Sequence, residues 1–457
     1  MGFPSNNVLL IYTFRSHAEN LFIRTSHLKS SEGVLMTKTS KISGFYKLAV
    51  QERLRLVSEF ADLTQEEASC ISAAGALSLD AADRMVENLI GVMEVPMGVA
   101  VNFLINGKDY LIPMAIEEPS VIAAASNAAR MARVGGGFTT SNTGPVMIGQ
   151  IQAVGIADPA GARMSILEKK DEIIRRANVV DPVLVKFGGG AKDVEVRVID
   201  TPGGKMVITH LIVDCRDAMG ANAVNTMAET VAPYIEELTG GRVYLRIISN
   251  FADKRIMRAK AVFTKEAIGG EEVVDGIIAA YNFAFSDPYR AATHNKGIMN
   301  GVTAAVLATG NDTRAIEAGA HVYASRTGIY RPLSCYEKNA NKDLVATIEM
   351  PMAVGLVGGA TKTNPIARTA VKILGVKTAI EMGEVFAALG LAQNFAAMRA
   401  LATEGIQRGH MGLHSRNVAI QAGATGELVD KIAEIMVKER KVRADRAKEL
   451  LDEMTGK

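Results

Sequence analysis

The sequence contains no tryptophan, and aromatic residues make up only 5% of the chain. It also lacks an excess of either charge, since 51 basic and 49 acidic residues leave a formal net charge of +2. Proteins that bind single-stranded nucleic acid stack bases on aromatic side chains along a basic surface. The composition therefore gives no support to binding of nucleic acid or of an anionic membrane surface.

Cysteine is also scarce, and Cys70, Cys215 and Cys335 stand far apart. Because there is no CxxC pair or cysteine–histidine cluster, neither a disulfide framework nor a zinc site is expected. We find no apolar run that approaches the length of a membrane span, and no secretory signal. These absences favour a cytoplasmic protein. Residues 1–35 are mixed and aperiodic, and we interpret them as a disordered leader or an unused upstream start.

Two common nucleotide motifs are missing. No G-x-G-x-x-G sequence follows a predicted strand, and Gly358 to Thr363 lacks the Gly-Lys pair of a Walker A loop. A metal site has little support. His410 and His414 are spaced for one helix face, but Met411 stands where the metalloprotease motif has glutamate, and no third ligand is evident. We therefore expect no catalytic metal.

The chain of 457 residues is long for one hydrophobic core and suggests two or three domains. Residues 147–249 are predicted to form strands and helices in the order β-α-β-β-α-β, a ferredoxin-like arrangement. We therefore predict an α+β multidomain fold. A small domain at 146–250 would be inserted into a large mixed α/β domain at 36–145 and 251–405, and a charged helical segment at 406–457 would follow.

Glu118 stands at a predicted junction between a strand and a helix. Strands at 98–105 and 108–116 flank Asn106-Gly107, a typical hairpin turn, and Pro119 then begins a helix. A partly buried carboxylate at such a junction can act as a general acid. An exposed glutamate in the first turn of a helix is the alternative.

The segment from Asp217 to Asn222 lies where the third strand of the small domain gives way to its second helix. Free N–H groups at a helix N-terminus suit a pyrophosphate, and small residues such as Gly220 allow close approach of the backbone. The alternative is that Asp217 only caps the helix.

Three further candidates lie in polar stretches of the chain. Residues 81–92 are predicted to be helical and contain Glu87. Lys296 and Asp312 are interpreted as loop residues that interrupt helical stretches, and loops often carry function. Solvated loops without a function are the alternative.

These residues resemble the signatures of a known family. Glu87 to Gly91 (ENLIG) resembles the ENVIG motif of hydroxymethylglutaryl-CoA reductases, with Leu89 where many members have valine. The resemblance runs from about Tyr46 to near the C-terminus, and its other motifs lie in the family's order at 117–120, 217–222, 293–300, 308–312 and 404–410. The Thr-His-Asn-Lys-Gly context of Lys296 and the lack of a membrane anchor resemble class II members.

The resemblance implies an oxidoreductase that converts hydroxymethylglutaryl-CoA to mevalonate and CoA by two hydride transfers from NADH, with NADPH also usable, or that runs the reverse oxidation. Lys296 would stabilise the oxyanion of the first step. His410, on a C-terminal flap at 406–457, would protonate the departing CoA thiolate, and Glu118 would supply protons at the carbonyl. Asp312 would link the lysine and the glutamate.

The resemblance also implies binding residues and partners. It assigns substrate contacts to Glu87, Asn88, Ser120, Arg290 and Asn300, and cofactor contacts to Asp181, Asp217, Ala218, Met219, Gly220 and Asn222. Asp181 matches a position where an aspartate can bond the ribose 2′-OH, which favours NADH. We expect a homodimer or larger homo-oligomer with active sites at the subunit interface, and neither nucleic acid nor membrane as a partner.

Two rival interpretations remain open. The chain could be a non-catalytic module that binds a CoA ester or a nucleotide, but all four catalytic residues of the family are present. It could also be an RNA-binding protein, since ferredoxin-like domains bind RNA. Its predicted strands at 194–200 and 243–249 lack the aromatic signature of such domains.

Overall fold

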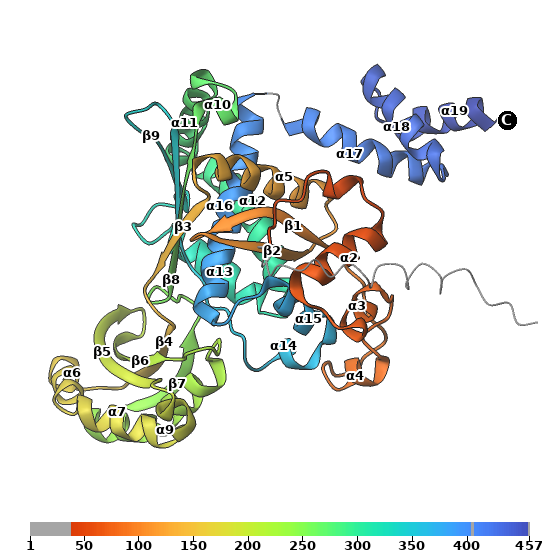
Figure 1. The fold of residues 1–457 in the computed structure, drawn as a ribbon. Coiled ribbons are helices and arrows are strands. Elements are labelled where there is room, and N and C mark those ends of the chain that lie inside the picture. The colour runs from red at the N-terminus through yellow and green to blue at the C-terminus, as the bar shows by residue number, and fades with distance from the viewer. Residues whose placement is uncertain (1–37, 404–405, 456–457) are drawn as a thin grey trace, which may run out of the picture. The chain divides into compact units, whose positions relative to one another are not determined.

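A computed structural model of the protein describes residues 38–403 and 406–455 (Figure 1). The side chains of Ala360, Lys362 and residues 406–413 lie outside this description. The expected leader at 1–35 also lies outside it. Residues 39–457 form one compact unit, so the domain boundaries within it stay predictions.

The first described elements are short helices. They are η1 (Phe45–Lys47), α2 (Val50–Ala61), α3 (Gln65–Ser72) and α4 (Leu79–Asp83). The helix expected at 81–92 is wrong beyond α4, since residues 84–92 form turns and irregular backbone. Asn88 has φ 58°, a left-handed conformation that asparagine tolerates and that a helix does not contain.

A six-stranded sheet has the order β2-β1-β3-β8-β10-β9. Its hairpin turns at Asn106 and Gly107, whose φ angles of 50° and 79° suit that tight turn and confirm the prediction. β3 precedes residues 146–250 in the chain and β8 follows them, and the two strands pair with each other. The strands are β1 (Met97–Ile105), β2 (Lys108–Ala115), β3 (Phe138–Asn142), β8 (Ile256–Phe263), β9 (Ser334–Lys338) and β10 (Leu344–Pro351).

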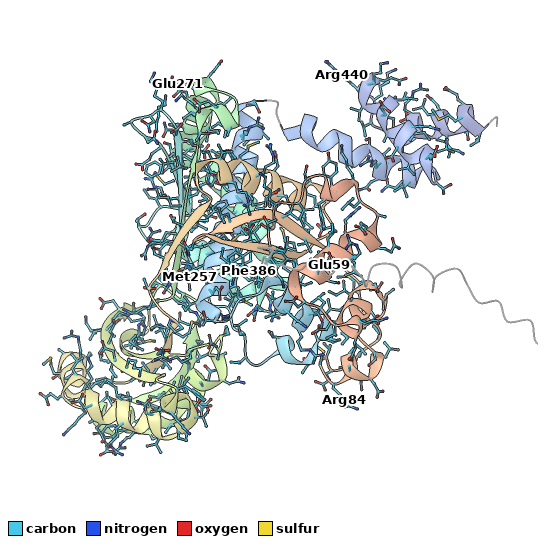
Figure 2. The ribbon with its side chains drawn as sticks, in the orientation of Figure 1. Glu59, Arg84, Met257, Glu271, Phe386 and Arg440 are labelled. Carbon is cyan, nitrogen blue, oxygen red and sulfur yellow. The ribbon has the colours of Figure 1, made fainter. Side chains whose placement is uncertain are left out.

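Long helices pack with this sheet. α5 and α12 both contact α16, which also contacts β8 and β10. Figure 2 shows Met257 of β8 and Phe386 of α16 in the interior, where both side chains are fully buried. The helices of this region are α5 (Pro119–Ala132), η2 (Arg133–Gly135), α10 (Lys265–Ile268), α11 (Glu271–Ser286), α12 (Pro288–Ala308), α13 (Thr313–Ala324), α14 (Ala360–Thr363), α15 (Pro365–Leu374) and α16 (Ala379–Ala402).

The expectation that no apolar run approaches a membrane span is wrong for α16. This helix of 24 residues is long and apolar enough to cross a membrane by length and composition. However, 67% of its most apolar window is buried inside the structure, which is typical of a core helix. Its apolar character is therefore explained by contacts on several sides with other helices and the sheet.

A four-stranded antiparallel sheet has the order β5-β6-β4-β7, which confirms the ferredoxin-like arrangement. α6, α7 and α9 pack on one of its faces (Figure 1). The helix expected at 159–179 is interrupted at Lys169. The elements are β4 (Val146–Val154), α6 (Pro159–Glu168), α7 (Lys170–Val179), α8 (Pro182–Lys186), β5 (Gly190–Thr201), β6 (Gly204–Asp214), α9 (Ala221–Thr239) and β7 (Arg242–Ser249).

The C-terminal segment is helical, as expected. It contains α17 (Ile406–Gln421), α18 (Glu427–Glu439) and α19 (Ala444–Thr455). These helices share a small hydrophobic core of their own, in which Val418, Ile432 and Leu450 are buried. A segment with its own core can keep its internal structure if it moves against the rest of the chain.

Candidate active site and dinucleotide loop

A cavity of about 730 Å³ lies beside α5, α12 and α16, and we name it the active-site cavity. Its lining includes five of the nine side chains assigned to catalysis and substrate binding, namely Glu118, Ser120, Arg290, Lys296 and Asn300. They come from two stretches of chain about 170 residues apart in the sequence, so the fold itself brings them together.

Glu118 is the N-cap residue of α5, and Pro119 is the first residue of that helix, as predicted. Its side chain does not cap the helix. Instead, the Ser120 hydroxyl donates a hydrogen bond of 2.6 Å to Glu118 Oε1. The half-buried carboxylate is therefore held at the cavity wall rather than used by the helix.

α12 supplies two cations of the active-site cavity, Arg290 and Lys296, and α16 supplies a third, Arg399. Lys296 was expected in a loop, and that expectation is wrong, because it lies inside this helix of 21 residues. The His-Asn-Lys-Gly sequence is turn-like, but Gly301 of the same helix packs against α16, where a Cβ would lie 3.0 Å from Gln393 Cβ. Tertiary packing thus overrides the low helix propensity of glycine. The Lys296 side chain remains exposed.

Asp312 is not among the residues that line the active-site cavity. It is the N-cap residue of α13 and accepts hydrogen bonds from the backbone N–H groups of Arg314 and Ala315. Its carboxylate also pairs with the Arg314 guanidinium at 3.0 Å, and this contact lowers the pKa of Asp312. The expected link from Asp312 to Lys296 is not among the described contacts, so it stays a prediction.

Several polar residues of the cavity lining escaped the sequence analysis, among them His294 and Gln393. His294 is fully buried, and its Nε2 lies 2.6 Å from the Ser334 hydroxyl. Burial lowers the pKa of His294 to about 3 and keeps the ring neutral. Gln393 is also buried and contributes to the cavity wall. An amide inside the apolar run of α16 was the signal that could have found it.

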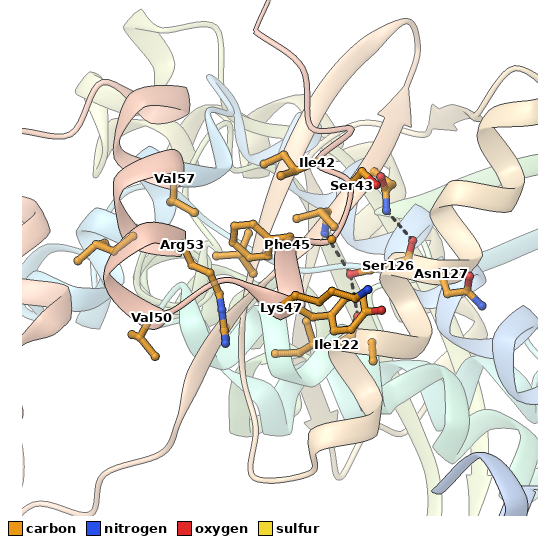
Figure 3. A pocket seen from close by; sticks show the side chains of 18 of the residues that line it. Ile42, Ser43, Phe45, Lys47, Val50, Arg53, Val57, Ile122, Ser126 and Asn127 are labelled. Atoms are coloured by element: carbon orange, nitrogen blue, oxygen red, sulfur yellow. Dashed lines mark hydrogen bonds between the residues drawn. The ribbon is translucent and has the colours of Figure 1, made fainter. Parts of the chain in front are cut away.

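A second cavity of about 930 Å³ adjoins the first, and we name it the basic cavity. The two share Ala123 and Asn127 of α5 in their linings. Figure 3 shows Lys47, Arg53 and Phe45 on its wall. Its cations are Lys41, Lys47, Arg53, Arg130 and Arg416, and no carboxylate is among its described lining residues. The sequence analysis missed this site.

The segment from Asp217 to Asn222, which we name the dinucleotide loop, leads into α9 as predicted. Gly220 is the N-cap residue with φ 107°, and no side chain caps the helix. Asp217 does not cap α9, since its Oδ1 accepts a 2.8 Å hydrogen bond from the Ala379 N–H. Within the described part of the chain, no side chain caps the start of this helix of 19 residues, and its first N–H groups therefore suit an anion.

Asp181 lies between α7 and α8, in the segment that leads to β5 of the four-stranded sheet. It is the N-cap residue of α8, and its side chain accepts a hydrogen bond of 2.9 Å from the Leu184 N–H. Gly190, at the start of β5, pairs with Asp214 at the end of β6, three residues before the dinucleotide loop. The Arg216 guanidinium donates to the Gly188 carbonyl and so joins these two segments.

Besides Asp312, three residues assigned to catalysis or substrate binding are not among the described lining of the active-site cavity. Glu87 and Asn88 are exposed, and neither lines the cavity. His410 lies inside α17, and its side chain falls outside the described residues. Among the described residues, no three His, Cys, Asp or Glu side chains are grouped to hold a metal.

Comparisons with known proteins show which family this chain is similar to. A model of the family hydroxymethylglutaryl-coenzyme A reductase matches residues 49–415. The 3-hydroxy-3-methylglutaryl-coenzyme A reductase of Archaeoglobus fulgidus is 64% identical over 428 residues, which is 94% of this chain and 98% of that protein.

Solved structures of reductases from Streptococcus pneumoniae are also similar. One is a class II enzyme bound to NADPH in open conformations, with 40% identity and a TM-score of 0.76 over 79% of this chain and 99% of that one. Another has 38% identity and a TM-score of 0.77 over 90% of this chain and 99% of that one. The chain therefore belongs to the hydroxymethylglutaryl-coenzyme A reductase family.

Proposed function

We propose that this enzyme interconverts hydroxymethylglutaryl-CoA and mevalonate in the active-site cavity, with two nicotinamide dinucleotides used per thioester. The observation that carries the proposal is the gathering of Glu118, Arg290 and Lys296 around one cavity beside the basic cavity. A substrate with a carboxylate, a thioester and a polyanionic tail needs such a pair of cavities.

The acyl part of the substrate would occupy the active-site cavity. Arg290 suits the free carboxylate, because a guanidinium can pair with it through two hydrogen bonds. Lys296 would stabilise the oxyanion that forms when a hydride reaches the thioester carbon. Glu118 would supply protons at the carbonyl, and Ser120 holds it for that role through their hydrogen bond.

The other two residues assigned to catalysis are not among the described lining of the active-site cavity. His410 would protonate the departing CoA thiolate from the C-terminal segment. Asp312 would tune Lys296 and Glu118 if the Arg314 ion pair opens when substrate binds. The side chain of Arg314 is 88% exposed, so solvent screens its ion pair with Asp312. The pair therefore holds the Asp312 carboxylate only weakly.

The CoA part would occupy the basic cavity. CoA carries a diphosphate and a 3′-phosphate, and the five lining cations, of which Arg416 also pairs with Asp430 at 2.6 Å, attract such a ligand. Phe45 and Tyr46 offer aromatic faces for the adenine ring. Pro119 lines the basic cavity while Glu118 and Ser120 line the other, so the pantetheine chain would cross the start of α5.

The dinucleotide would bind at the dinucleotide loop, where the uncapped N-terminus of α9 fits its diphosphate. When bound, it supplies the hydride for each reduction. We propose that NADH is preferred, because a 2′-phosphate would meet the charge of Asp181. NADPH would remain usable, since Arg175, Arg176 and Lys186 are close in sequence, and a reductase with 40% identity was solved with NADPH.

We also propose a homo-oligomer in the cytoplasm. Glu87 and Asn88 belong to a segment whose apolar side chains Ile90 and Met93 are largely exposed, with relative exposures of 104% and 86%. A second copy covering this segment would bring Glu87 to an active site at the interface. The three cysteines form no disulfide, which suits a reducing compartment.

The stoichiometry of cofactor oxidation tests the proposal. Purified enzyme given hydroxymethylglutaryl-CoA should oxidise two NADH for each thioester consumed and release mevalonate and CoA. One equivalent with accumulating aldehyde would contradict the two-step mechanism. Binding of the thioester without any turnover would support the alternative of a non-catalytic binding module.

A further inference from the structure

Arg255 places a cation in the interior directly behind the dinucleotide loop. It precedes β8, its side chain has 0% exposure, and it is among the largest fully buried side chains. Its Nη1 donates to the carbonyls of Ala218 at 3.1 Å and Met219 at 3.4 Å, and its Nη2 donates to the Val354 carbonyl at 2.6 Å. Its Nε is buried without a hydrogen-bond partner.

No carboxylate forms an ion pair with this guanidinium among the described residues. The nearby Asp217 bonds the Ala379 N–H, and Asp214 pairs with Arg216 at 3.4 Å. The Cys215 thiol cannot replace a carboxylate, because burial raises its pKa to about 12 and keeps it neutral. Burial also lowers the pKa of Arg255, but arginine remains protonated in proteins. The Asp214 and Asp217 carboxylates therefore offset this buried charge only at a distance, and a cation in the interior without an ion-pair partner is costly.

Arg255 also ties three chain segments together. Its own carbonyl accepts from the Met352 N–H at 3.0 Å, and the Asp217 carbonyl accepts from the Leu356 N–H at 2.8 Å. The segments touch closely, since a Cβ on Gly355 would lie 2.5 Å from the Met219 nitrogen. The guanidinium thus fixes the backbone two residues before α9 begins, and its charge lies behind the uncapped N-terminus of that helix.

We propose that Arg255 is a positioning residue for the dinucleotide, which holds the dinucleotide loop in shape and adds a buried positive charge behind the site of the diphosphate. The inference rests on the proposed function, since it assumes that the dinucleotide binds at this loop. A bound diphosphate would add negative charge to that of the Asp214 and Asp217 carboxylates, which act on Arg255 but form no ion pair with it. The cost of burying the cation is then offset when the ligand arrives.

The test compares variants that separate charge from hydrogen bonding. Arg255→Gln keeps a donor for the carbonyls but loses the charge, and Arg255→Lys keeps the charge. Arg258→Met is the matched control, because this arginine lies on β8 and pairs with Glu349 away from the loop. Calorimetry would give Kd for NADH, for nicotinamide riboside, which has no phosphate, and for hydroxymethylglutaryl-CoA. Circular dichroism and Tm would report folding.

We expect Arg255→Gln to raise the Kd for NADH roughly 10- to 100-fold, the usual scale of a misplaced binding group. Arg255→Lys should retain most of the affinity, and binding of nicotinamide riboside and hydroxymethylglutaryl-CoA should stay unchanged in both variants. Equal losses for NADH and nicotinamide riboside would overturn the proposal, because a merely structural role predicts them. So would wild-type affinity for NADH in Arg255→Gln, or a loss in Arg255→Lys as large as in Arg255→Gln.

Two other outcomes are also decisive. If Arg255→Gln does not fold, the result for Arg255→Lys alone decides, and weak NADH binding by a folded lysine variant would overturn the charge role. If wild-type protein binds neither NADH nor NADPH, the proposed function itself fails, and that failure is distinguishable because it does not depend on Arg255.

Discussion

In the proposed function, the active-site cavity and the dinucleotide loop would use different parts of the chain to attract anionic groups. The cavity uses charged side chains on helices, such as Arg290 and exposed Lys296. The loop would use backbone N–H groups at the start of α9, with small residues in front and the buried Arg255 guanidinium behind. A catalytic side chain must interact with a substrate whose charge changes during the reaction. A diphosphate keeps its charge, and a rigid backbone can bind it. The first site should therefore be sensitive to side-chain changes and the second to backbone changes.

Among substitutions in the active-site cavity, Lys296→Ala should cause the largest loss of turnover. We expect turnover to fall by at least about a thousandfold, because the main stabiliser of the oxyanion is removed. The fold should survive, since the side chain is exposed on α12. Steady-state kinetics and circular dichroism would measure both, with Lys205→Ala, at the start of β6 in the other sheet, as the control. Near-full activity would remove Lys296 from the mechanism.

His410→Gln should affect only one of the two reductions. We expect a loss of roughly two to four orders of magnitude with the thioester, the usual effect of a general acid, and a much smaller loss with added mevaldehyde. His414→Gln is the matched control on the same helix, and it should keep its activity. Equal losses in both half-reactions would show that His410 positions the C-terminal segment instead.

Asp181→Asn tests the proposed choice between NADH and NADPH at the dinucleotide site. Asparagine also caps helices well, so α8 should keep its hydrogen bond to the Leu184 N–H while the charge is lost. We expect kcat/KM for NADPH to rise by roughly 3- to 10-fold, because repulsion of about 1 kcal/mol between solvated charges disappears. The NADH value should change little. An unchanged ratio of the two efficiencies would separate Asp181 from cofactor choice.

His210 should give the smallest effect, on stability rather than activity. Burial, with nearby Arg197, lowers its pKa from 6.5 to about 4, so the folded protein holds it neutral. The unfolded chain binds more protons between these values, and the free energy of unfolding should fall as pH drops from about 6.5 toward 4. The slope is at most about 1.4 kcal/mol per pH unit. Urea titrations of His210→Gln should show a shallower slope, and an identical slope would exclude this histidine.

Local patterns predicted much of the fold, and their failures have a physical cause. The hairpin at Asn106 and the ferredoxin-like order were readable because turn chemistry and strand periodicity are local. Lys296 was assigned to a loop because packing of α12 on α16 decides its helix, and that contact is long-range. The basic cavity was invisible because its cations come from distant segments, from Lys41 to Arg416.

Ligand binding by the variants Gly220→Ala and Lys296→Ala tests most directly whether the dinucleotide loop binds the dinucleotide and the active-site cavity carries out the reaction. A side chain at Gly220 would overlap the Cys215 sulfur and strain a backbone at φ 107°. The account predicts that Gly220→Ala loses affinity for NADH and keeps that for hydroxymethylglutaryl-CoA, while Lys296→Ala binds NADH normally and does not turn over. Normal NADH binding by Gly220→Ala, or lost NADH binding in Lys296→Ala, would contradict it.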